Sequence, residues 1–221
     1  MNTVSHLVRQ ERQRMKNYLL EIGTEELPVG FIESLEDQLT PLLETTLKEA
    51  RISFKNINFY STPRRFAFII EDLCDKQTDI TKTLRGPLSS IAYKDGEPTK
   101  AVLGFCKKAG IPVEKLTTED VNGKEYVFAK IEEKGKPVEE ILQEAMPKVV
   151  LSLKGSHFMR WGDLSDKFQR PIRWIVSVID DKPLPIAIAD VASTAHSQGH
   201  RFLSQGPVEI KSIKSYVEDL K

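Results

Sequence analysis

The sequence predicts an α+β fold in which mixed or antiparallel sheets pack against helices. Strand-like and helix-like segments alternate irregularly along the 221 residues, and several strand-like runs follow one another at hairpin spacing. The regular strand–helix–strand alternation that produces a parallel doubly wound sheet does not occur. With 40% hydrophobic and 29% charged residues, the composition is that of an ordinary folded protein.

The fold is expected to begin with a short strand and a long amphipathic helix. Residues 18–22 are rich in strand-forming side chains and end at a glycine. Thr24 then offers a hydroxyl for capping a helix, and Pro28 fits a first turn, which tolerates a missing N–H. From there apolar residues recur every three or four positions to about Ala50, and Pro41 predicts a kink or a break within that helix.

The remaining elements follow from apolar runs separated by turn-forming residues. Strands are predicted at 52–60, 66–70, 125–131, 174–179, 184–191 and 208–210, and loops at 61–65 and 84–87. One helix opens at Pro98 and closes at Gly110. A second covers 138–153, where Pro147 interrupts the pattern, and Ser212 is expected to cap a third over 213–220.

Residues 1–16 are interpreted as an N-terminal extension, and residues 17–221 as an α+β region with an internal boundary near 154–157. The extension is polar and basic and lacks the apolar stretch of a secretory signal. A transit-like segment, a vector remnant and a misplaced start are the alternatives, and we favour a start near Met15. We expect a cytoplasmic location, or a plastid one if residues 1–14 are the remnant of a transit segment. A final helix that reaches the last residue suggests that the protein continues.

Composition also narrows the classes of function. The formal net charge is zero, from 32 basic and 32 acidic residues, so bulk charge does not predict a nucleic-acid binder. Cys74 and Cys106 lack any zinc-ligand spacing, which favours reduced thiols and no metal site. No apolar run approaches the ~18–20 residues of a membrane span. Phosphate-binding glycine loops, nucleophile elbows and HExxH patterns are absent from the sequence, so we expect no bound cofactor and no catalytic residue.

Three acidic residues form the first candidate site: Glu21, Glu25 and Glu26. One interpretation is a paired-carboxylate site for acid–base chemistry. The other is structural: a strand end followed by a helix N-terminus, where the helix dipole favours carboxylates. We favour the structural interpretation, because the dipole alone would select this spacing. His200, in a predicted loop, could act as a base, but without a partner nucleophile a structural role is favoured.

Arginines gather in five short segments that also contain Gly, Pro or aromatic residues: 62–65, 85–87, 159–162, 170–174 and 199–202. Guanidinium groups held at turns suit phosphate binding, and neighbouring aromatic rings could stack on RNA bases. Alternatively, the arginines tie loops to the three carboxylates, with Trp161 and Trp174 in the core. Spacing leaves both interpretations open. The candidates for RNA binding or a subunit interface are Arg64, Arg65, Arg85, Arg160, Arg170, Arg173, His200 and Arg201.

Seven segments stand in an order typical of one known family: residues 19–28, 62–67, 85–87, 98–105, 159–162, 170–174 and 199–202. This series resembles the N-terminal third of the glycyl-tRNA synthetase beta subunit of bacteria and plastids. The resemblance covers roughly residues 17–212, nearly the whole chain. Each segment alone is weakly diagnostic, and the specificity comes from seven of them in register. Residues 1–16 match nothing in the family.

The resemblance implies a role in joining glycine to its tRNA. In that family the alpha subunit holds the class II active site for ATP and glycine, the beta subunit supplies tRNA recognition, and the two form an α2β2 heterotetramer. This chain would then dock glycine tRNA and contact the alpha subunit, with no catalytic residue and with ATP used only through the alpha subunit. Two alternatives stay open. One is an interface scaffold without RNA contact, and the other is a hydrolytic or editing site built on Glu21, Glu25, Glu26 and His200.

Overall fold

The computed structural model describes residues 14–94, 96–161, 163, 165–200, 202, 204 and 206–220. The chain forms two compact units: the larger runs to Gln77 and resumes at Lys136, and the smaller is the inserted segment 78–135. Each unit contains sheet and helix, which confirms the α+β class with mixed and antiparallel sheets. Residues 154–157, near which we predicted an internal boundary, lie inside the larger unit.

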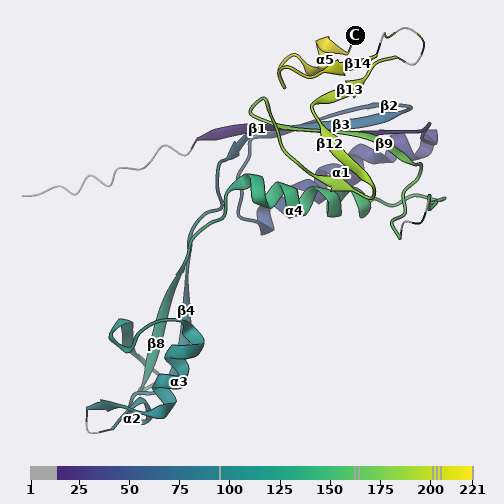
Figure 1. Ribbon diagram of the computed structural model, residues 1–221. Helices are drawn as coiled ribbons and strands as arrows, with labels where there is room; N and C mark the ends of the chain where they lie inside the picture. The colour runs from purple at the N-terminus through teal and green to yellow at the C-terminus, as the bar shows by residue number, and fades with distance from the viewer. Residues whose placement is uncertain are drawn as a thin grey trace, which may run out of the picture. The chain divides into compact units, whose positions relative to one another are not determined.

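A mixed sheet forms the centre of the larger unit, with strand order β11-β12-β9-β1-β3-β2 and with β10 also paired to β9 (Figure 1). The neighbouring strands are antiparallel except for β12 and β9, which run parallel. The strands are β1 (Met15–Thr24), β2 (Asn56–Thr62), β3 (Arg65–Cys74), β9 (Ile172–Ile179), β10 (Lys182–Pro183), β11 (Ala187–Ile188) and β12 (Val191–Thr194). Strand β1 is therefore central and pairs with β3 on one side and β9 on the other.

The two faces of this sheet are covered differently. Side chains alternate between faces along a strand, so Leu20 and Ile22 pack with the helices α1 (Val29–Glu49) and α4 (Val138–Leu151). Leu19 belongs to a second apolar cluster, with Ile210 and Tyr216 of the C-terminal segment. That segment contains β13 (His196–Gln198), β14 (Pro207–Glu209) and α5 (Tyr216–Asp219). Figure 1 shows α1 and α4 on one side of the sheet and β13, β14 and α5 on the other. The C-terminal segment thus covers the face that the helices leave free.

Helix α1 continues through Pro41, so the predicted break is wrong. Its buried residues recur at every fourth position: Phe31, Leu35, Leu39, Leu43 and Leu47. A proline inside a helix costs about 3 kcal/mol, whereas burying one leucine side chain contributes roughly 1.5–3 kcal/mol. Leucines on both sides of Pro41 therefore hold the helix together.

The predicted helix start at Thr24 is also wrong. Thr24 is the last residue of β1, and its backbone N–H donates to the Arg64 carbonyl at 2.8 Å. The Glu25 N–H donates to the Pro171 carbonyl at 3.2 Å, so neighbouring segments hold this stretch out of a helix. Helix α1 begins after Pro28, and its first turn contains no acidic residue. Glu25 and Glu26 therefore do not interact with a helix dipole.

Three other predicted boundaries need correction. The strand expected over 52–60 begins at Asn56, because the Ile52 N–H donates to the Leu47 carbonyl and closes the end of α1. The strand expected over 184–191 is divided into β11 and β12, with Ala189 between them at a positive φ of 57°. The last helix is a single turn, α5, whose N-cap is Ser215 and not the predicted Ser212, and Ser215 makes no side-chain capping bond.

The smaller unit has its own antiparallel sheet, in the order β4-β8-β7. These strands are β4 (Ile80–Leu88), β8 (Lys124–Glu133) and β7 (Leu116–Val121), and they pack with α2 (Ser89–Ala92) and α3 (Lys100–Ala109). The unit also holds the short pair β5 (Tyr93–Lys94) and β6 (Glu97–Pro98) and a 3-10 turn at Val113–Lys115. As predicted, α3 ends at Gly110, whose φ of 68° is left-handed. The predicted loop at 84–87 is wrong, because these residues lie in β4 where its register against β8 shifts.

Candidate functional site

An open cavity of about 1190 Å³ lies in the larger unit, beside the last residues of β1 and the turn between β2 and β3. It brings together six of the residues that the sequence singled out: Glu25, Glu26, Arg64, Arg65, Arg173 and His200. The other lining residues are Tyr60, Ser61, Thr62, Pro63, Trp174, Gln198, Gly199, Phe202, Ser204, Gly206, Tyr216, Val217 and Leu220. Residues from both ends of the chain therefore build one concave surface.

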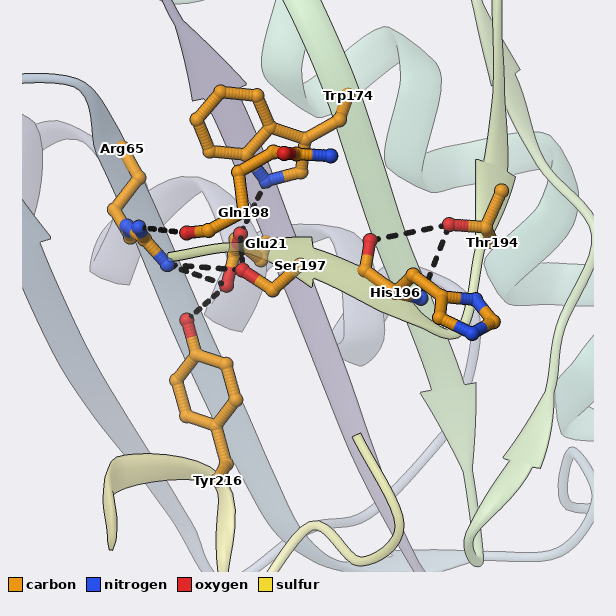
Figure 2. A network of polar contacts seen from close by, with 8 residues as sticks. All are labelled: Glu21, Arg65, Trp174, Thr194, His196, Ser197, Gln198 and Tyr216. Atoms are coloured by element: carbon orange, nitrogen blue, oxygen red, sulfur yellow. Dashed lines mark hydrogen bonds and ion pairs between the residues drawn. The ribbon is translucent and has the colours of Figure 1, made fainter. Parts of the chain in front are cut away.

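Glu21 lies next to this cavity as a fully buried carboxylate. Its Oε1 accepts hydrogen bonds from the Trp174 indole N–H and from the Ser197 hydroxyl, the latter at 2.5 Å. Its Oε2 accepts one from the Tyr216 hydroxyl at 2.5 Å and lies 3.6 Å from Arg65 Nη1 (Figure 2). A buried charge is expensive unless it is paired and hydrogen-bonded. Glu21 meets both conditions, with one cation and three donors.

Arg65 completes the enclosure of this carboxylate. Its Nη1 donates to the Ser197 hydroxyl at 2.9 Å, and its Nη2 donates to the Gln198 carbonyl. Its guanidinium carbon also lies 5.6 Å from the centre of the Trp174 ring, a cation–π distance. Arg65 is thus committed to contacts within its own chain, as the loop-tying interpretation expected.

The Tyr216 phenol is a proton donor in this network. Burial raises its pKa well above the usual value, and the neighbouring Glu21 charge and the hydrogen bond to it raise the pKa further. The hydroxyl therefore stays protonated at neutral pH and donates a hydrogen bond to Glu21. It joins the C-terminal segment to the centre of the sheet.

Gly23 has to be a glycine because of Trp174. A Cβ atom at position 23 would lie 1.9 Å from Cε2 of the indole, which is far inside any allowed contact. The indole therefore lies directly against the β1 backbone, and its N–H reaches Glu21 two residues earlier. This packing explains why an acidic residue and a glycine stand together at the end of an apolar run.

Glu25 forms a second and more open cluster. Its Oε2 lies 3.3 Å from Arg64 Nη2, and its Oε1 lies 3.4 Å from Arg173 Nε. The exposed fractions of these side chains are 42% for Glu25, 29% for Arg64 and 60% for Arg173. Glu26 is exposed at the same cavity and forms no ion pair with any described residue. The wall of the cavity thus carries one carboxylate shared by two arginines.

His200 is exposed at the cavity and accepts a 3.3 Å hydrogen bond at Nδ1 from the Phe202 N–H. Within the described part of the chain, no hydrogen bond links its imidazole to Glu21, Glu25 or Glu26. The described residues also include no group of three or more His, Cys, Asp or Glu side chains placed to hold a metal ion. Over the same residues, no helix is long and apolar enough to cross a membrane.

Sequence comparison assigns the chain to a family. The profile described as "Glycyl-tRNA synthetase beta subunit" matches residues 18–221. The chain belongs to this family. This confirms the family predicted from the seven ordered segments, four of which contribute residues to the cavity or to the Glu21 network.

Several relatives are named glycine–tRNA ligase beta subunit. The one from Trichodesmium erythraeum is 43% identical over 208 residues, which are 92% of this chain and 29% of the relative. Those from Acaryochloris marina and Clostridioides difficile are each 40% identical, over 94% of this chain and 30% of the relative. The chain therefore spans about 30% of the length of the curated relatives it matches.

Three further candidate arginines, Arg85, Arg160 and Arg170, are not among the residues that line the cavity. Arg160 is exposed, and Arg170 is half-buried with Nη1 donating to the Gln169 carbonyl at 2.7 Å. Arg85, in the smaller unit, is exposed and lies 3.6 Å from the centre of the Tyr126 ring. Arg201 lies outside the described residues. Of the five arginine segments, 62–65, 170–174 and 199–202 contribute residues to the cavity.

Sequence reasoning missed Ser197, Gln198 and Tyr216 as members of the site. One signal was available: Glu21 interrupts an otherwise apolar strand, and a buried carboxylate needs donors from elsewhere in the chain. The loop-tying interpretation of the arginines placed both tryptophans in the core. Trp174 is half-buried over Gly23, and Trp161 packs on the main core cluster while its indole N–H donates to Asp190 at 3.3 Å.

Proposed function

We propose that this chain is a tRNA-docking and assembly region of a glycine–tRNA ligase beta subunit. Glycine would be joined to its tRNA, at the expense of ATP, in the active site of an alpha subunit, within an α2β2 assembly in the cytoplasm. In this proposal the region described here binds no cofactor and performs no bond-making step. Family membership supports the reaction class, and the name "beta subunit" implies an alpha partner.

The observation that carries the RNA-docking proposal is the exposure of the Arg173 side chain on the cavity wall. Its side chain is 60% exposed on the cavity wall, and its Nε lies 3.4 Å from Oε1 of Glu25. A guanidinium group exposed in this way can be reached by an incoming anion. Phosphate groups supply most of the affinity and orientation in protein–nucleic acid complexes, and arginine binds them through two parallel hydrogen bonds.

The structure also separates the arginines by role. Arg65 is engaged with Glu21, Ser197 and Gln198, so it serves to position the C-terminal segment. Arg64 is intermediate between Arg65 and Arg173, because it is half-buried and shares the Glu25 carboxylate with Arg173. In this proposal RNA phosphates meet Arg173 first and Arg64 second.

The proposal is tested with Arg173→Ala in the full alpha–beta enzyme. Loss of one phosphate contact should weaken binding of a glycine tRNA transcript roughly three- to ten-fold and reduce the slope of log K against log salt by about one. Glycine-dependent adenylate formation, which needs no tRNA, should persist. Arg160→Ala is the matched control, since Arg160 is exposed but does not line the cavity. Equal losses of tRNA affinity in both variants would show that the cavity has no special role in RNA binding.

A second candidate is a subunit-interface scaffold that makes no RNA contact. It is favoured by the fact that Arg64, Arg65 and Arg173 all reach carboxylates of their own chain. In that case Arg173→Ala would leave both the tRNA affinity and its salt slope unchanged. Sedimentation of the enzyme at decreasing concentration would instead show easier dissociation of alpha from beta.

A further inference from the structure

Glu25 occupies a position between two arginines that suits an anion. Its two carboxylate oxygens are divided between two guanidinium groups, with Oε2 at 3.3 Å from Arg64 and Oε1 at 3.4 Å from Arg173. The two arginines are held by separate parts of the sheet: Arg64 in the turn between β2 and β3, and Arg173 in β9. An oxyanion with two free oxygens in one plane would make the same pair of contacts.

We propose that the Glu25 carboxylate is a removable counter-ion that marks the site of one RNA phosphate. In the RNA-free protein it pairs with both Arg64 and Arg173, and on docking a phosphodiester takes its place through its two non-bridging oxygens. The inference rests on the proposed tRNA-docking function and adds to it a defined anion site and a competitor within the chain.

Glu25 can leave this position without disturbing the fold. Its side chain is 42% exposed, and ion pairs between exposed groups contribute little to stability. Its backbone is fixed independently, by the 3.2 Å hydrogen bond from its N–H to the Pro171 carbonyl. The Arg64 backbone is fixed as well, since its carbonyl accepts from the Thr24 N–H at 2.8 Å. The backbones at Glu25 and Arg64 therefore stay in place when the carboxylate rotates into solvent.

Aromatic groups in the same cavity favour RNA over an acidic protein segment. Phe202 is 85% exposed, and its ring centre lies 6.2 Å from that of His200, which is also exposed. Unstacked RNA bases bind to such rings in a way that tolerates sequence differences. A phosphate between the two arginines would leave its attached base within the same concave surface.

The test compares Glu25→Gln with Glu26→Gln in the full alpha–beta enzyme. Both variants remove one negative charge from the same cavity, but only Glu25 bridges arginines. Glu25→Gln should bind a glycine tRNA transcript roughly three- to ten-fold more tightly, because RNA no longer displaces a competing carboxylate. Glu26→Gln should change the affinity less than about two-fold. Contacts made by the rest of the enzyme cancel in these ratios.

A double variant distinguishes failure of this inference from failure of the proposed function. In an Arg173→Ala background, Glu25→Gln should give at most a small gain, because one of the two cations that it frees is gone. If Arg173→Ala weakens tRNA binding but Glu25→Gln matches Glu26→Gln, the counter-ion role is wrong and the docking function stands. If Arg173→Ala has no effect on tRNA, the docking function itself is wrong. Tighter alpha–beta association in Glu25→Gln, with unchanged tRNA affinity, would assign the anion site to an acidic segment of the partner and overturn the RNA assignment.

Discussion

Glu21 and Glu25 stand four positions apart in the sequence, and both meet arginines, but their surroundings are opposite. Glu21 is fully buried, with one arginine and three hydrogen-bond donors around it. Glu25 is 42% exposed and has two arginines and no other side-chain partner among the described residues. Burial makes each of Glu21's partners necessary, because an unpaired charge in the interior cannot be solvated. Exposure makes Glu25's partners exchangeable, because water or another anion can replace them.

The comparison shows how one short motif serves two purposes. The first carboxylate fastens the C-terminal segment to the sheet through Ser197 and Tyr216, and residues of that segment line part of the cavity. The second lies in the cavity that this fastening helps to create. Loss of the Glu21 carboxylate should therefore affect the stability of the fold, and loss of the Glu25 carboxylate should affect tRNA binding.

The largest expected effect is that of Glu21→Gln on stability. The amide removes the counter-charge of Arg65 and replaces one of the two acceptor oxygens with a donor, which then faces the donors that this oxygen served. Breaking a buried pair in this way costs about 3–5 kcal/mol, which urea unfolding of the purified chain would measure. Glu26→Gln, at an exposed position, should stay within about 0.5 kcal/mol. If Glu21→Gln were as stable as the Glu26→Gln control, the partners of Glu21 would not be necessary for the fold. The distinction between Glu21 and Glu25 would then be wrong.

The sequence predicted the local parts of this arrangement and could not predict its long-range contacts. Apolar runs located β1, β3 and β9, and the glycine after α3 was placed correctly, because these features depend on neighbouring residues. Glu21 finds Trp174, Ser197 and Tyr216 at separations of 153, 176 and 195 residues. No periodicity encodes such pairings, since the topology of the sheet decides them.

The inserted unit illustrates the same limit. Strand β8 resembles the other strands in composition, so the sequence indicated strand structure near 125–131 but not which sheet those residues would join, and it did not predict β4 as a strand. Both interpretations of the arginines remained open for a related reason. Whether a guanidinium reaches a carboxylate of its own chain depends on the burial of that carboxylate, which is a tertiary property. Arg65 ties loops as one interpretation expected, and RNA contact by Arg173 stays a prediction.

A second prediction concerns the Tyr216 hydroxyl. Tyr216→Phe removes a buried donor to a charged acceptor and should destabilise the chain by about 1.5–3 kcal/mol at neutral pH. Because the folded state raises the pKa of Tyr216 above its unfolded value near 10, the stability that this proton provides is complete below pH 10. It is lost as the pH rises above that value, by about 1.4 kcal/mol per pH unit.

The pH dependence gives this second prediction its control. The difference in unfolding free energy between the wild type and Tyr216→Phe should be constant from pH 7 to 9 and should shrink above pH 10. Lysines and other tyrosines titrate in the same range, but they do so in both proteins and cancel in the difference. A difference that does not change up to pH 11 would show that Tyr216 does not hold its proton against the Glu21 charge.

The smallest expected effect is that of Gly23→Ala, which tests whether Trp174 really holds the buried cluster together. A methyl group at this position would overlap the indole and push it away from Glu21. Such overpacking costs about 1–3 kcal/mol, and the displaced indole should also change the tryptophan fluorescence. Gly30→Ala provides a control of opposite sign: Gly30 lies in α1, nothing stands within 4 Å of an added Cβ, and alanine should stabilise the helix by about 0.5–1 kcal/mol. If both alanines stabilise the chain, the indole has room to move. The Trp174 contact would then be exchangeable, like the contacts of the exposed Glu25, even though Glu21 is buried.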